Sequence, residues 1–241
     1  MAADFPAGGP VPVHLVIGPP GCGKTTALSA LARLHPWLAR FGVRDYGLRL
    51  AALGDPLGLA ARETLLRQGI LPDALVRDQF THFLDRLDPS HRVVVVEGYP
   101  RSPRQCADLD EAVGRRERER IAGLVIVEVP DDVAFERVSG RRICADCGTP
   151  APAGRAGCEQ CGGRVVTRRD DTAARFAERL AEYHGVAARL RGHFAARDLV
   201  RTVDGTRDPQ AVRTRLQELL LAGPARPEPA ADRAGGGAAA R

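Results

Sequence analysis

Lysine and long apolar runs are almost missing from this 241-residue sequence. The chain carries 35 lysines and arginines, and only Lys24 is a lysine. Because arginine is used everywhere else, one arginine is weak evidence for function, whereas the lone lysine indicates a position that needs lysine chemistry. No apolar run approaches the roughly 20 residues of a membrane-spanning helix, so we expect no membrane partner. The first ten residues have neither a basic nor an apolar segment, so we expect no secretory signal and a cytoplasmic location.

The composition leaves several function classes open. The net charge of +5 suits a protein that binds phosphates, but it equally suits one that binds nucleic acid. Four of the six cysteines form two close pairs. In a protein without an export signal, paired cysteines are interpreted as metal ligands before disulfides.

The order of the segments predicts a three-layer α/β fold with a parallel sheet. Short β-branched runs alternate with stretches of helical periodicity, which is typical of βαβ units. The expected strands are 13–17, 93–96, 124–129 and 200–203, and the expected helices are 25–34, 58–68, 73–87, 103–112, 131–139, 171–197 and 209–221. We predict a core over 12–221, a flexible N-terminus at 1–11 and a disordered tail at 222–241, where Ala, Pro and Gly cannot bury enough apolar surface.

A phosphate-binding motif follows the first expected strand. It reads Gly18-Pro19-Pro20-Gly21-Cys22-Gly23-Lys24-Thr25 and fits the pattern G-x-x-x-x-G-K-[ST] of a P-loop. In this context, backbone N–H groups and the helix N-terminus bind phosphates, with the ammonium of Lys24 between the β and γ positions. We expect Thr25 to ligate Mg²⁺. A glycine-rich turn without function is the alternative, which the full pattern between a strand and a helix disfavours.

The motif therefore predicts ATP with Mg²⁺ as its ligand. The predicted ATP-binding residues of the loop are Gly18, Pro19, Gly21, Cys22, Gly23, Lys24, Thr25 and Thr26. Cys22 is interpreted as a small residue whose backbone does the binding, and we assign its thiol no role.

Further motifs, in order along residues 13–220, resemble the adenylate kinase family. Glu97-Gly98-Tyr99-Pro100-Arg101-Ser102-Pro103-Arg104-Gln105 is similar to D-G-[FY]-P-R-T-x-x-Q, Arg137-Val138-Ser139-Gly140-Arg141-Arg142 to R-x-x-G-R-R, and Thr167-Arg168-Arg169-Asp170-Asp171 to T-R-x-D-D. The resemblance implies a P-loop NTPase fold and phosphoryl transfer from ATP to a nucleoside monophosphate. It also implies an acceptor-binding region at 40–72 and a lid at 142–167. We expect a monomer.

The resemblance also implies roles for single residues. Arg101, Arg168 and Arg179 would hold the transferred and acceptor phosphates, and Arg49 would hold the acceptor. Arg137 and Arg141 would hold ATP, and Asp170 would anchor the lid arginines. Glu97 would organise the water shell of Mg²⁺, and Gln105 would bind the adenine edge of the acceptor. Lys24, Arg101, Arg137, Arg168 and Arg179 are the expected catalytic residues.

Two cysteine pairs lie inside the expected lid. Cys144-x-x-Cys147 and Cys158-x-x-Cys161 are separated by the ten residues 148–157. Four thiolates at this spacing predict a closed tetrahedral site, and hence a structural Zn²⁺ that stabilises a subdomain too small for its own core. Two disulfides are the alternative.

One segment departs from the family pattern and leaves the acceptor open. Asp45-Tyr46-Gly47-Leu48-Arg49 stands where the family has S-T-G-D-x-L-R, so Tyr46 is expected beside the acceptor base. AMP is the first expectation, and another nucleotide or a small phosphorylatable molecule is the second. A third is a regulatory or nucleic-acid-binding protein with a zinc ribbon, which we disfavour because the cysteine pairs lack interleaved aromatic residues.

Overall fold

The structure is a computed structural model that describes residues 9–67, 70–145, 150–151, 154–159, 161–167 and 171–221. The predicted disordered tail at 222–241 lies outside these residues, as does the expected flexible N-terminus except for 9–11. Val11 already belongs to the first strand. Among the described helices, none is both long enough and apolar enough to cross a membrane.

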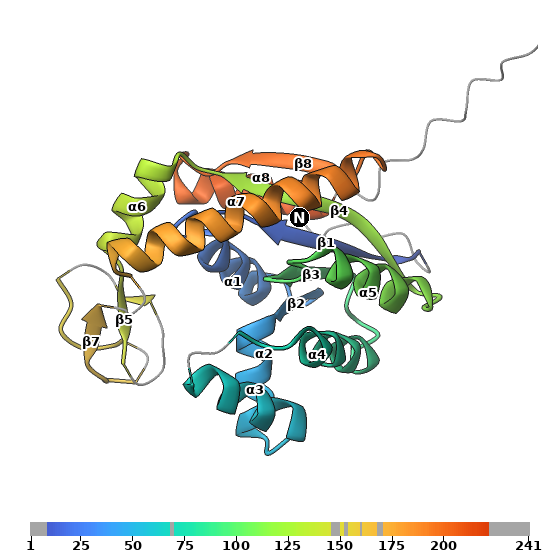
Figure 1. Cartoon of the computed structure of the whole chain (residues 1–241), viewed down its shortest axis with the longest axis horizontal. Helices are drawn as coiled ribbons and strands as arrows, with labels where there is room; N and C mark the ends of the chain where they lie inside the picture. The colour runs from blue at the N-terminus through green and yellow to red at the C-terminus, as the bar shows by residue number, and fades with distance from the viewer. Residues whose placement is uncertain are drawn as a thin grey trace, which may run out of the picture.

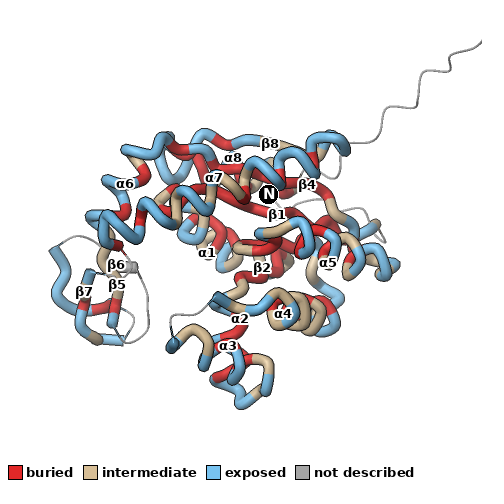
Figure 2. Tube along the Cα trace, viewed as in Figure 1, coloured by how far each residue is buried: buried red, intermediate tan, exposed pale blue. Residues whose placement is uncertain are grey.

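A five-stranded parallel sheet forms the centre of the molecule (Figure 1). In spatial order its strands are β2 (Leu38–Gly42), β3 (Val93–Glu97), β1 (Val11–Ile17), β4 (Glu119–Glu128) and β8 (Val200–Asp204). The three central strands are buried along most of their length, because valine, isoleucine and leucine fit a sheet covered on both faces. Figure 2 shows this buried centre. The predicted parallel sheet is confirmed.

Helices cover both faces of the sheet and complete the three layers. On one face, α1 (Lys24–Leu34), α6 (Asp131–Ser139) and α8 (Pro209–Leu221) pack with alternate strand residues such as Val93 and Val95. On the other face, α4 (Asp73–Asp85), α5 (Pro103–Gly114) and α7 (Ala173–Ala195) pack with residues such as Val94 and Val96. The alternation follows from the two-residue period of a strand.

Two elements of the expected acceptor region were not predicted. Strand β2 has Arg40 at its centre, and helix α2 (Val43–Ala52) has Gly47 in its interior, so each departs from the usual residue preferences. Both form through tertiary contacts. Helix α3 (Pro56–Leu66) packs so closely on α2 that a Cβ on Gly58 would lie 2.0 Å from the backbone nitrogen of Ala51.

A small antiparallel sheet is inserted between α6 and α7. Its order is β6 (Pro150–Ala151), β5 (Arg142–Cys144) and β7 (Val165–Thr167). In Figure 1 it lies at the end of the molecule where α6 ends and α7 begins. This sheet occupies the segment that the sequence assigned to a lid.

Candidate active site

The P-loop joins the end of β1 to the start of α1. Gly21 and Gly23 have φ angles of +87° and +85°, which side-chain-bearing residues rarely adopt, so the motif glycines are required by the backbone. A Cβ on Gly21 would lie 2.4 Å from the carbonyl oxygen of Ala134 on α6. No side chain of the described residues caps the N-terminus of α1. Its first N–H groups therefore remain available for an anion.

The structure brings Lys24, Thr25 and Glu97 together at the mouth of this loop. Lys24 Nζ donates a hydrogen bond to the carbonyl oxygen of Gly18 at 3.1 Å and lies 3.9 Å from the sulfur of Cys22. The hydroxyl of Thr25 donates to Oε1 of Glu97, at the end of β3. A hydroxyl beside a carboxylate provides the oxygen ligands that Mg²⁺ prefers, either directly or through water, so this pair fits the predicted metal.

Arg40 also belongs to this cluster, and the sequence interpretation missed it. Its Nη2 lies 2.7 Å from Oε2 of Glu97 and 3.0 Å from Oδ2 of Asp45. Burial is the largest influence on the pKa of Arg40 and lowers it, but the charges and hydrogen bonds of Glu97 and Asp45 together raise that pKa above its ordinary value. Arg40 is therefore a fixed positive charge. The signal in the sequence is an arginine between apolar residues in the segment Leu38–Gly42.

The loop after β3 presents Arg101 to solvent. Arg101 Nε donates to the carbonyl oxygen of Gly98 at 3.0 Å, and its Nη1 lies 3.3 Å from Oε1 of Glu182. The buried amide of Gln105 accepts the backbone N–H of Arg101 at 2.7 Å and donates to Oδ1 of Asp73 at 2.6 Å. Gln105 thus fixes the loop that carries Arg101. Its predicted contact with an adenine edge stays a prediction.

Tyr46 and Arg49 belong to helix α2, in the segment that departs from the family pattern. Tyr46 is 8% exposed, packs against Phe41 and Phe83, and places its hydroxyl 2.7 Å from Nδ1 of His82. Arg49 is exposed on α2, with its guanidinium 5.3 Å from the centre of the Tyr46 ring. Tyr46 is therefore packed between α2 and α4, and the expected roles of Tyr46 beside the acceptor base and of Arg49 at the acceptor stay predictions.

A buried carboxylate joins the two ends of the inserted segment. The side chain of Asp171 has no solvent exposure and binds Arg141 through both oxygens, at 2.8 and 2.6 Å. Arg179 Nη1 lies 3.5 Å from the same carboxylate. The prediction gave this anchoring role to Asp170, which, like Arg168, lies outside the described residues.

Arg137 occupies the neighbouring helix α6. Its Nη1 donates to the carbonyl oxygen of Gly205 at 2.7 Å, at the turn that follows β8. Gly205 has no room for a side chain, because a Cβ would lie 2.6 Å from Val129 and 2.7 Å from Val127. This hydrogen bond fixes the exposed side chain of Arg137 against the turn that follows β8.

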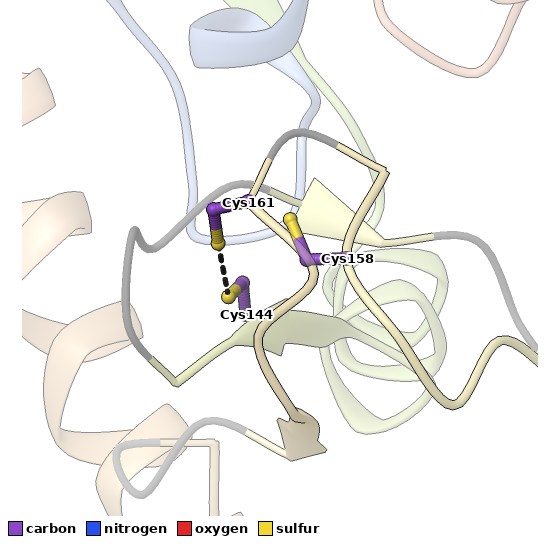
Figure 3. A group of neighbouring side chains, drawn as sticks. All are labelled: Cys144, Cys158 and Cys161. Atoms are coloured by element: carbon purple, nitrogen blue, oxygen red, sulfur yellow. Dashed lines mark hydrogen bonds between the residues drawn. The ribbon is translucent and has the colours of Figure 1, made fainter.

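Three of the four predicted metal ligands converge in the small sheet (Figure 3). The sulfur atoms of Cys144, Cys158 and Cys161 all lie within 4.8 Å of one another, and those of Cys144 and Cys161 are 3.5 Å apart. Thiolates bound to one tetrahedral Zn²⁺ at about 2.3 Å are separated by about 3.8 Å. The three described cysteines therefore fit a zinc site. Cys147, the fourth predicted ligand, lies outside the described residues.

The turn that carries two of these thiols has a regular backbone. The N–H of Gly162 donates to the carbonyl oxygen of Cys158 at 2.9 Å, and Gly162 has a φ of +72°. The N–H of Cys158 donates to the carbonyl oxygen of Gly163 at 2.8 Å. These bonds fold the chain back so that Cys158 and Cys161 face the same point.

Comparisons with known proteins agree with this geometry. A family model described as an AAA domain matches residues 17–146. An adenylate kinase of Symbiobacterium thermophilum is 32% identical over 87% of this chain and 99% of its own length. The adenylate kinases of Novosphingobium aromaticivorans and Syntrophobacter fumaroxidans are 30% and 29% identical, each over 86% of this chain and 98% of their own length.

The chain belongs to the adenylate kinase family. The resemblance seen in the motifs is confirmed, and the protein is an enzyme of the phosphotransferase class. The match therefore spans nearly the whole length of the relative from Symbiobacterium thermophilum and most of this chain.

Proposed function

We propose that this enzyme transfers the γ-phosphoryl group of Mg·ATP to a nucleoside monophosphate, with AMP as the first acceptor and ADP as the only nucleotide product. The observation that carries the proposal is the cluster at the ends of β1 and β3, where Lys24, Thr25 and Glu97 meet. Three adenylate kinases that match almost the whole chain support AMP.

Each residue of the cluster has a task in this reaction. Phosphoryl transfer needs two anionic groups placed in line and neutralisation of the charge on the moving group. The N–H groups of the P-loop and the ammonium of Lys24 would bind the β- and γ-phosphates. Thr25 and Glu97 would hold Mg²⁺, which neutralises phosphate charge when it is bound. Arg101 would bind the transferred group from the side of the acceptor.

The lid would exclude water from the transferred group. We propose that the segment 142–167 moves as one body, because a zinc bound by its cysteines would make a subdomain without a core of its own rigid. The pair of Asp171 and Arg141 connects this body to α7. Closure would favour the acceptor over water as the attacking group.

A second acceptor is favoured by one observation. The segment 45–49 departs from the family pattern of the acceptor region, and its Tyr46 is buried with the hydroxyl beside Nδ1 of His82. A nucleotide other than AMP, or a small phosphorylatable molecule, is the second candidate.

The test is ADP formation from Mg·ATP with AMP, CMP, UMP, GMP or dTMP, each beside a reaction without an acceptor. Lys24→Met purified in parallel controls for contaminating kinases. Turnover with AMP well above the other acceptors would support the proposal. Preference for another nucleotide would replace AMP, and no transfer to any of the five would reject nucleoside monophosphate kinase activity and favour a small-molecule acceptor or a regulatory role.

A further inference from the structure

Arg40 and Glu97 lie on the same side of the sheet, beside the P-loop helix. In the register of the parallel strands β2 and β3, Arg40 lies beside Val95, two residues before Glu97. Val95 packs in the cluster that contains α1, and alternate strand residues share a face. The side chains of Arg40 and Glu97 therefore both extend toward α1, and the register of the strands brings them together.

The two oxygens of the Glu97 carboxylate have different partners. Oε1 accepts the hydroxyl of Thr25, and Oε2 accepts Nη2 of Arg40 at 2.7 Å. The side chains of Arg40 and Glu97 are only 16% and 10% exposed. A carboxylate that is largely removed from water needs a positive partner, and the guanidinium of Arg40 serves as that partner.

Asp45 adds a second carboxylate to this group. Its Oδ2 lies 3.0 Å from the same Nη2 of Arg40, and its side chain is half exposed. Two carboxylates and one guanidinium leave the group with one negative charge. Arg40 therefore cancels part, but not all, of the charge that attracts a divalent cation to Thr25 and Glu97.

We propose that Arg40 is the counter-ion of Glu97 and prevents free Mg²⁺ from binding tightly at the P-loop before ATP, so that the site takes the metal together with the nucleotide. The inference rests on the proposed function, because it takes Thr25 and Glu97 as the residues that hold Mg²⁺. The reason is electrostatic. A positive charge in contact with a metal-binding carboxylate repels a second cation, and the phosphates of ATP supply the negative charge that outweighs this repulsion.

The test measures Mn²⁺ binding to the nucleotide-free protein at low ionic strength, with the signal of the free ion in electron paramagnetic resonance as the readout. Arg40→Gln removes the charge and keeps a hydrogen-bond donor, Arg40→Lys keeps the charge, and Asp45→Asn removes one carboxylate. The double variant Arg40→Gln/Asp45→Asn restores the wild-type charge of the group. Arg33→Gln is the matched control, because it removes an exposed arginine at the far end of α1.

We expect Arg40→Gln to bind Mn²⁺ about tenfold tighter than the wild type, which is the scale of one unit charge a few ångströms away in a hydrated site. Asp45→Asn should bind the ion more weakly. Arg40→Lys, the double variant and Arg33→Gln should stay within about threefold of the wild type. Adding Glu97→Gln to Arg40→Gln should abolish the gain, which would locate the ion at Glu97.

A non-hydrolysable ATP analogue provides the control for an intact site. With it present, every variant that retains Glu97 should bind about one Mn²⁺ per chain. If Arg40→Gln fails to fold, Asp45→Asn carries the test, and an unchanged affinity in that variant would overturn the inference.

Two further outcomes would overturn the inference. An unchanged or weaker affinity in Arg40→Gln would mean that Arg40 only holds Glu97 in place. An equal gain in Arg33→Gln would assign the effect to the net charge of the whole protein. A wild-type enzyme that transfers to no nucleotide would instead reject the proposed function, which this binding measurement does not test.

Discussion

The carboxylate of Asp171 and the guanidinium of Arg141 form a two-point ion pair at the base of the inserted sheet, with N–O distances of 2.6 and 2.8 Å. Arg141 directly precedes β5, and Asp171 lies shortly before α7. The pair therefore joins the two points at which the chain enters and leaves this small subdomain. Because the carboxylate is fully buried, its partners cannot be replaced by water without cost.

Asp171→Asn keeps the shape of this side chain and removes its charge. Arg141 and Arg179 would then share a neutral amide, and we expect the free energy of unfolding to fall by about 1–3 kcal/mol. The KM for ATP should rise, because Arg141 would no longer be held in position. Urea denaturation and steady-state kinetics measure the two effects.

Glu178→Gln is the matched control for this substitution. The carboxylate of Glu178 pairs with Arg175 on the exposed side of α7. A surface pair of this kind contributes less than about 1 kcal/mol, so stability and the KM for ATP should change little. A wild-type urea midpoint in Asp171→Asn would show that the buried pair does not stabilise the fold.

Lys24→Met and Lys24→Arg test the P-loop directly. Neither variant can place an ammonium beside the carbonyl of Gly18, and the guanidinium of the second is too broad for the loop, so we expect turnover to fall about 100-fold or more in both. The melting temperature should stay close to that of the wild type. Arg33→Met, at the far end of the same helix, should retain full activity. Substantial turnover in Lys24→Met would contradict the assignment of the P-loop.

Sequence reasoning succeeded where the signal is local. The strand β1, the P-loop and α1 are contiguous, and each of them follows from the spacing of glycines and apolar residues over a short segment. The three described cysteines likewise converge, and the spacing of Cys158 and Cys161 reflects a compact turn. The predicted anchor of the lid arginines, Asp170, lies outside the described residues, and the structure shows its neighbour Asp171 bound to Arg141.

The acceptor region could not be predicted in this way. Strand β2 contains a charged residue, Arg40, whose burial depends on Glu97 from a strand more than fifty residues later in the chain. Helix α2 contains Gly47, a poor helix former, and a Cβ there would lie 2.9 Å from Ala61 on α3. In both elements, contacts between distant segments outweigh local preference.

Removing the metal tests the cysteine cluster. We expect about one Zn²⁺ per chain, and chelation should release it, expose reactive thiols and lower the melting temperature. Cys144→Ser should lose most of the bound zinc. Cys106→Ser is the control, because Cys106 lies on the buried face of α5. Burial, with a smaller effect of Asp110, raises the pKa of its thiol to about 11. Purified protein without metal, in which the cysteines are oxidised to disulfides, would reject the zinc site.

Because of His14, we expect the free energy of unfolding to depend on pH, and this dependence can be measured without an activity assay. The side chain lies in β1 with 3% exposure, and its Nε2 has no hydrogen-bond partner among the described residues. Burial lowers the pKa of His14 to about 4, with a smaller opposing effect from the backbone of Leu220. The native state therefore keeps this imidazole neutral at pH values where the unfolded chain protonates it.

The consequence is a loss of stability as the pH falls. Above pH 6.5, the ordinary pKa, neither state is protonated at this site and the full stability is present. Between 6.5 and about 4 the unfolded chain binds more protons than the native state, and the free energy of unfolding should decrease by about 3 kcal/mol in all, at roughly 1.4 kcal/mol per pKa unit. Urea midpoints at pH 7.5, 6 and 5 measure the slope. His14→Leu should flatten it, whereas His184→Gln, at an exposed pair with Asp131, should keep it. An equal slope in His14→Leu would assign the acid sensitivity to other groups.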